Sequence, residues 1–167
     1  MGFMTRCAMF VVLTAATSTI VACGGGADTE VTGTETADID NCSLVTDAEA
    51  SALVGEEVKH EEDSMLGCPY VRPGKSISEF TVRAFAGKGA AKDNFGEHSA
   101  DVTVHEIAGV GDSAAVLARE EHVNFLIVQK GRRYVQFVTT FVDDMTLGSP
   151  KLKDAQDLAL KAVDRIK

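Results

Sequence analysis

Histidine is the side chain that most often transfers protons near neutral pH, and this chain of 167 residues has four of them. They are widely spaced, at His60, His98, His105 and His122. No serine stands in the Gly-x-Ser-x-Gly pattern that exposes a nucleophile. Ser113 would need a distant histidine, and Asp143-Asp144 is more typical of a solvated strand end than of a cation site. The sequence therefore predicts no catalytic residue and no cofactor.

A short glycine motif, Gly109-Val110-Gly111-Asp112, precedes Ser113. A phosphate-binding loop has a further glycine or a Lys-Ser/Thr ending, and it leads into a helix. Neither ending is present here, and residues 115–117 have the Ala-Val-Leu composition of a strand. We interpret the motif as a tight turn in which glycine adopts positive φ values.

The first 22 residues have the pattern of a secretory signal. Arg6 is followed by the uncharged residues 7–22, a run shorter than the roughly 20 residues that a membrane-spanning helix needs. Ile20-Val21-Ala22-Cys23 resembles the lipobox of bacterial lipoproteins, whose cysteine is acylated (with palmitate, for example) and becomes the new N-terminus. We predict a signal peptide at 1–22 and a lipid anchor at Cys23. An uncleaved membrane helix and secretion with a free Cys23 are the alternatives.

Acylation of Cys23 predicts attachment to a lipid bilayer, because two or more acyl chains give stable membrane binding. The protein would then be exposed outside the cytoplasm, on the outer face of the cytoplasmic membrane or, in a bacterium with two membranes, on the outer membrane. Residues 23–41 contain four Gly, four Thr and five acids, and are predicted to be a flexible linker. The formal charge is −9, and −10 once residues 1–22 with Arg6 are removed, which argues against a nucleic-acid partner.

Two cysteines remain once cleavage has removed Cys7 and acylation has used Cys23, namely Cys42 and Cys68. In an oxidising compartment an isolated cysteine pair predicts a disulfide. Metal binding is the competing interpretation. It would need two more ligands, and no histidine has the spacing that is typical of such sites, so we predict no metal site.

Residues 42–167 are predicted to form one globular domain, with helices near both of its ends. Thr46 and Glu49 have the capping-box spacing of a helix that ends at Gly55. Ser149-Pro150 begins a final helix, with Ser as N-cap and Pro in the first turn. Its apolar residues recur at helical spacing, at Leu152, Ala155, Ala159, Val163 and Ile166. Residues 87–100 are predicted to be a further helix.

Strand patterns fill much of the sequence between these helices, at 68–71, 80–85, 102–107, 115–117, 123–130 and 132–142. The last two form a hairpin with its turn near Lys130-Gly131, and Phe141 shares a face with Val135 and Phe137. The charged segment 56–64 is expected to be a loop or an edge. The fold class predicted is α+β, a twisted, mainly antiparallel sheet of about five or six strands packed by two or three helices.

The hairpin turn carries two adjacent arginines, which is unusual in so acidic a chain. Arginine binds carboxylates and phosphates through a planar fork of donors. We therefore name Arg132, Arg133 and the adjoining Tyr134 as candidate ligand- or partner-binding residues. The alternative is that a charged hairpin tip only keeps the domain soluble.

The chain also resembles uncharacterised cell-envelope lipoproteins of actinobacteria, of the mycobacterial type, which carry a two-cysteine domain of unknown function. The resemblance rests on Cys42-Ser43-Leu44-Val45-Thr46, the helix that ends at Gly55, Gly67-Cys68-Pro69-Tyr70, residues 109–114, the hairpin and the last helix. It covers nearly all of the mature chain. It implies that Cys42 pairs with Cys68, and it implies no catalytic residue.

These patterns lead to two functional hypotheses. The first is a membrane-anchored, non-enzymatic binding or accessory module of the cell envelope, whose partner is an envelope protein, a glycan or a small apolar ligand. Such a module needs a concave, partly apolar surface without clustered titratable groups. The second is an envelope hydrolase, which needs a histidine within hydrogen-bond reach of a nucleophile or an acid. We expect the first.

Overall fold

The computed structural model describes residues 39–167; the predicted signal peptide, Cys23 and the linker up to residue 38 lie outside the described residues. The chain forms two short 3-10 helices, two α-helices and seven strands. The helices are η1 (Asn41–Ser43), α1 (Asp47–Val54), η2 (Ala91–Asn94) and α2 (Pro150–Arg165). The strands are β1 (Lys59–His60), β2 (Cys68–Val71), β3 (Ser78–Ala86), β4 (Val102–Ile107), β5 (Ser113–Arg119), β6 (His122–Lys130) and β7 (Arg133–Val138).

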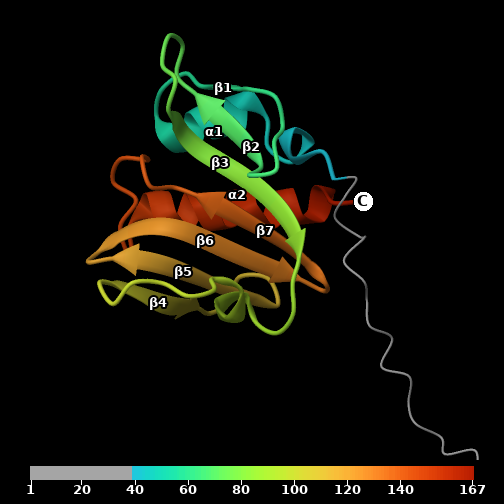
Figure 1. Cartoon of the computed structure of the whole chain (residues 1–167), viewed down its shortest axis with the longest axis vertical. Coiled ribbons are helices and arrows are strands. Elements are labelled where there is room, and N and C mark those ends of the chain that lie inside the picture. Colours follow the sequence, from blue (N-terminus) through green and yellow to red (C-terminus); the bar gives the residue numbers. More distant parts are fainter. Residues whose placement is uncertain (1–38) are drawn as a thin grey trace, which may run out of the picture. The chain divides into compact units, whose positions relative to one another are not determined.

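The seven strands form one sheet in the order β1-β2-β3-β7-β6-β5-β4, and every neighbouring pair is antiparallel. The α+β class and the antiparallel sheet are therefore confirmed. The predicted count of five or six strands is too low by at least one, because the charged segment 56–64 contributes β1, whose Lys59 and His60 pair with Val71 and Tyr70 of β2. Figure 1 shows the central strands running side by side with α2 lying along the sheet.

Both α-helices begin where their capping residues predict, and α1 also ends at the predicted residue. The hydroxyl of Thr46 accepts a hydrogen bond from the backbone of Glu49 (3.3 Å), the carboxylate of Glu49 accepts from the backbone of Thr46 (3.0 Å), and Gly55 ends α1 at φ 91°. The hydroxyl of Ser149 accepts from the backbone of Leu152 (3.1 Å) at the start of α2. Within residues 39–167, no helix combines the length and the hydrophobicity needed to cross a membrane.

The main core lies between the sheet and the two helices. The apolar stripe predicted for the last helix is buried and packs mainly on β6 and β7. Phe80 and Phe137 meet edge to face beneath it, with ring centroids 4.8 Å apart. The opposite face of the sheet carries a smaller apolar cluster of Ala91, Ala115, Ile127 and Tyr134, against which Phe85, Phe95 and Val104 pack.

The helix predicted at residues 87–100 is wrong, because this segment forms only η2. Three glycines in it, at 87, 89 and 96, weaken helix formation. Its conformation is held instead by contacts with the sheet: the backbone N–H of Ala91 donates to the hydroxyl of Ser113 (2.9 Å), and the hydroxyl of Tyr134 donates to the carbonyl of Gly89 (2.7 Å). The segment therefore covers the small cluster as an irregular strap.

The second hairpin strand is shorter than predicted. It ends at Val138 rather than at residue 142, and Phe141 is 55% exposed instead of sharing the buried face of Val135 and Phe137. Thr139 still bonds to β6, through its N–H to the carbonyl of Asn124 (2.8 Å) and its hydroxyl to the carbonyl of Val123 (2.7 Å). The chain then turns away, because the carbonyl of Thr139 accepts a hydrogen bond from the N–H of Val142 (3.0 Å).

Candidate functional site

A cavity of about 550 Å³ lies where the β6–β7 turn, the end of β3 and the end of α2 meet. These three ends lie close together near the C-terminus in Figure 1. The lining of the cavity combines basic and apolar side chains. The basic residues are Lys130, Arg132, Arg133 and Lys167, and the large apolar residues are Ile39, Phe85, Val163 and Ile166. Ala86, Gly131 and Asp164 complete the lining. Arg132 and Arg133, two of the residues singled out in the sequence, are thus brought together at the cavity.

The positive charge of this cavity contrasts with the rest of the domain. Residues 1–38 hold Arg6 and four acids, so residues 39–167 hold 15 basic against 21 acidic side chains, a formal charge of −6. The cavity holds four basic side chains and one acid, Asp164, whose carboxylate is 2.6 Å from the ammonium of Lys130. In the described part of the chain, Arg133 and Lys167 form no ion pair. Positive charge is therefore concentrated at this cavity in an otherwise acidic domain.

The glycine motif at residues 109–112 contacts the β6–β7 turn. Gly109 and Gly111 have φ values of 77° and 59°, and β5 follows directly, so the interpretation as a tight turn is confirmed. The carboxylate of Asp112 accepts a hydrogen bond from the backbone N–H of Gly131 (2.6 Å), and its own N–H donates to the carbonyl of Gln129 (2.9 Å). This turn therefore fixes the position of the β6–β7 turn and of the arginines beside it.

The N-terminal wall of the cavity is held by Asn41. Its side-chain oxygen accepts a hydrogen bond from the backbone N–H of Ala84 (2.7 Å), and its side-chain nitrogen donates to Asp63 (3.1 Å), as does its backbone N–H (2.9 Å). These bonds dock the segment that includes Ile39 along the edge of β3. Residues 39–41, which the sequence predicts to belong to the linker, are therefore part of the folded unit.

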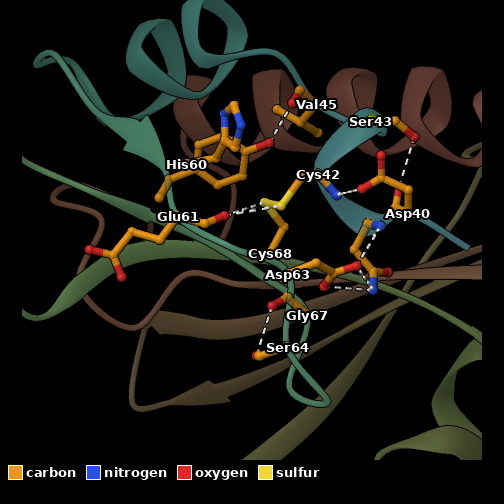
Figure 2. The surroundings of a disulfide bond; sticks show 12 residues. Asp40, Cys42, Ser43, Val45, His60, Glu61, Asp63, Ser64, Gly67 and Cys68 are labelled. Carbon is orange, nitrogen blue, oxygen red and sulfur yellow. Dashed lines mark hydrogen bonds between the residues drawn. A yellow bond between two sulfur atoms is a disulfide. The ribbon is translucent and has the colours of Figure 1, made fainter.

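The predicted disulfide between Cys42 and Cys68 is present beside this docking point. The two Cα atoms are 5.0 Å apart, and the bond links η1 to the start of β2 (Figure 2). It closes a separation of 26 residues and ties the N-terminal wall to the sheet. The disulfide therefore contributes indirectly to the shape of the cavity.

The same region carries a turn with two exposed apolar side chains. The backbones of Ser64 and Gly67 bond to each other (2.9 and 3.2 Å), so that Met65 and Leu66 form the tip. Figure 2 shows this turn next to Cys68. Met65 is 92% and Leu66 is 77% exposed, which is unusual for side chains of this size.

Tyr134, the third candidate binding residue, does not line the cavity. Tyr134 is buried on the sheet face next to Phe85, and the two rings stack with their centroids 5.3 Å apart. The hydroxyl of Tyr134 donates a hydrogen bond to the carbonyl of Gly89. Burial raises the pKa of this phenol. Tyr134 therefore positions the aromatic wall of the cavity and the η2 strap.

The four histidines lie on different elements: His60 on β1, His98 after η2, His105 on β4 and His122 on β6. His60 contacts the carboxylate of Asp47 at 2.7 Å, His98 the carbonyl of Gly96 and His122 the carbonyl of Thr140. Within the described residues, none of these bonds joins a histidine to a Ser, Thr or Cys side chain, and no three His, Cys, Asp or Glu side chains gather as a metal site.

Sequence reasoning missed most of the cavity, although it found the two arginines. Lys130 adjoins them in the sequence, but Lys167, Ile39 and Phe85 come from distant elements and share no motif with the hairpin. The arrangement can bind an anionic group and an apolar group side by side. Comparison with protein-family models, with curated proteins and with solved structures found no match to this chain.

Proposed function

We propose that the chain is a membrane-anchored extracytoplasmic lipoprotein that acts as a non-enzymatic binding module of the cell envelope. In this proposal, acyl chains on Cys23 hold the protein on the bilayer, and the cavity at the β6–β7 turn is its binding site. The observation that carries the binding role is a concave, partly apolar lining that holds four basic side chains and no histidine.

Two features support the extracytoplasmic location. The Cys42–Cys68 disulfide is typical of proteins that leave the reducing cytoplasm. The residues before Cys23 have the pattern of a lipoprotein signal. Both are expected of one protein that is exported and then anchored.

The tether would enter the folded unit beside the binding site. Fifteen residues separate Cys23 from Ile39, a chain that spans at most roughly 50–60 Å, and Ile39 lines the cavity. A ligand delivered from the membrane or from the adjoining envelope is therefore within reach of the cavity.

The alternative function, an envelope hydrolase, has less support. General acid–base catalysis needs a histidine within hydrogen-bond reach of a nucleophile or of the reacting group. His60 pairs with Asp47, but no nucleophilic side chain is bonded to His60, and it does not line the cationic cavity.

The proposal is tested on the full chain expressed in its membrane, beside a Cys23→Ser variant. We expect the wild-type mass to show an acylated Cys23 at the N-terminus, with residues 1–22 removed, and a mass gain when the disulfide is reduced. The Cys23→Ser protein should lack the acyl mass and leave the membrane fraction. A wild-type protein that keeps residues 1–22 and carries no acyl group would overturn the anchor.

A further inference from the structure

From the lining of the cavity we infer the class of its ligand: an anionic amphiphile, whose phosphate or carboxylate group binds Arg133 and Lys167 while its apolar part lies against Ile39 and Phe85. This inference deepens the binding role proposed above and rests on it. The lipid bilayer as a whole is a different partner, and the test below separates the two.

One side of the cavity is cationic. Arg133 and Lys167 lack a carboxylate partner among the described residues, and Lys130 and Arg132 add positive charge next to them. The carbonyls at the end of α2 and the carboxylate of Asp164 reduce this charge, but four basic side chains outnumber them. An anion would relieve the repulsion between the cations, and the guanidinium fork of Arg133 suits a phosphate or carboxylate group.

The other side of the cavity is apolar. The ring of Phe85 is half-buried and held by stacking on Tyr134, and Ile39 is held by the bonds of Asn41. Val163 of α2 and Ile166, directly after α2, complete this wall. These contacts keep the apolar surface in place without a ligand, as in a preformed small-molecule site.

Only a ligand with an anionic group and an apolar part can contact both the cationic and the apolar side of the cavity. A free phosphate ion would leave the apolar wall in water, and a purely apolar ligand would remove water from cations that have no partner, which is unfavourable. The cavity, about 550 Å³, falls within the roughly 300–1,000 Å³ of sites for small molecules. We therefore expect a single-chain or short amphiphile.

The test measures binding of dodecyl phosphate, below the concentration at which it forms micelles, by calorimetry. Every core residue that the structure describes and the disulfide lie within 39–167, so a chain that begins at Gly24 keeps the folded unit. We expect one dodecyl phosphate to bind per chain, at least tenfold more tightly than inorganic phosphate, because each buried methylene adds roughly 0.8 kcal/mol. Binding should weaken as the salt concentration rises.

Two double variants locate the binding site. Arg133→Gln with Lys167→Gln should weaken the binding of dodecyl phosphate by roughly tenfold or more, because each contact with a charged group contributes substantially to affinity. Lys59→Gln with Lys75→Gln removes the same charge outside the cavity and should leave the affinity unchanged. All four side chains are exposed, so both variants should fold.

Three results would overturn the inference. The first is equal affinity of wild type and Arg133→Gln/Lys167→Gln for dodecyl phosphate. The second is equal affinity of wild type for inorganic phosphate and dodecyl phosphate, which would identify a free anion. The third is association with phosphatidylglycerol vesicles that survives the Arg133→Gln/Lys167→Gln change but is lost in Met65→Ser with Leu66→Ser, which would identify docking on a membrane surface. If dodecyl phosphate binds but the mass of the full chain shows no acyl group on Cys23, the anchor is contradicted and the ligand class is kept.

Discussion

Arg165 and Glu49 form a two-point ion pair that joins the end of α2 to the start of α1. Both distances between guanidinium nitrogen and carboxylate oxygen are 2.7 Å, and the same guanidinium donates to the carbonyl of Leu44 (2.7 Å). Glu49 is also the capping-box residue of Thr46. One carboxylate therefore completes the N-terminus of α1 and holds α1 to a helix 116 residues further along the chain.

Replacing either partner should lower the stability of the domain, and the two changes should not be additive. We expect Arg165→Met and Glu49→Gln to show a coupling of about 1–2 kcal/mol in the free energy of unfolding, more than a typical surface pair because the contact has two hydrogen bonds. The value is limited by solvent screening, since the Arg165 side chain is 36% exposed. Urea unfolding of both single variants and the double variant measures this coupling, and strictly additive effects would contradict it.

The same pair should make the domain sensitive to acid. The hydrogen bond from Arg165 lowers the pKa of Glu49 to about 2, against the opposing effect of burial and with help from Thr46. Because the pKa is lower in the folded state than its usual value of 4.5, the pair stabilises the domain above that value, and this stability is lost as the pH falls toward about 2.

In Glu49→Gln this loss should be smaller by about 1–2 kcal/mol, after allowance for solvent screening. Unfolding free energies measured from neutral pH down to about pH 2 test the expectation. Arg165→Met should show a similarly flattened profile, because the carboxylate has lost its partner. A wild-type slope in both variants would show that Glu49 does not govern this transition.

The two glycines of the turn at 109–112 should differ in their tolerance of a side chain. A Cβ at Gly111 would lie 2.3 Å from the carbonyl oxygen of Gln129, a backbone atom that cannot move aside, whereas a Cβ at Gly109 would meet nothing within 4 Å. Both have positive φ, so both substitutions are strained. We expect Gly111→Ala to cost at least about 1 kcal/mol more than Gly109→Ala in thermal or urea unfolding. Equal costs would mean that the β6–β7 turn does not need this support.

Removing the disulfide should destabilise the domain strongly. Cys42→Ala with Cys68→Ala should lower the free energy of unfolding by about 3–4 kcal/mol, on the chain-entropy account of a closed loop, here with a separation of 26 residues. A reducing agent should destabilise the wild type in urea unfolding and have no effect on the double variant. A loss below about 1 kcal/mol would mean that η1 is held mainly by the bonds of Asn41.

The parts of the fold that were predicted correctly depend on neighbouring residues. Thr46 with Glu49 and Ser149 with Pro150 place the starts of both helices, because capping bonds join residues three apart. The alternation of buried and exposed side chains around Val82 in β3 and the β6–β7 hairpin are likewise local patterns. The disulfide followed from the count of cysteines left after the predicted cleavage and acylation, which is a property of composition.

The parts that failed depend on distant contacts. Tyr134 and Ser113 hold the segment 87–100 in an irregular form, and the hydroxyl of Thr139, directly after β7, donates to the carbonyl of Val123. Their partners lie 45, 22 and 16 residues away in the sequence. No pattern within a window of local residues contains such information.

Patterns of nearby residues predicted the class of the fold, the starts of both α-helices, the cysteine pair and two adjacent arginines at a turn. They did not predict that these arginines line a cavity with Ile39, Phe85 and Lys167. Side chains from β3, β7 and the end of α2 become neighbours only when the sheet has formed and α2 has packed across it. The combination of charge and apolar surface is a property of that packing.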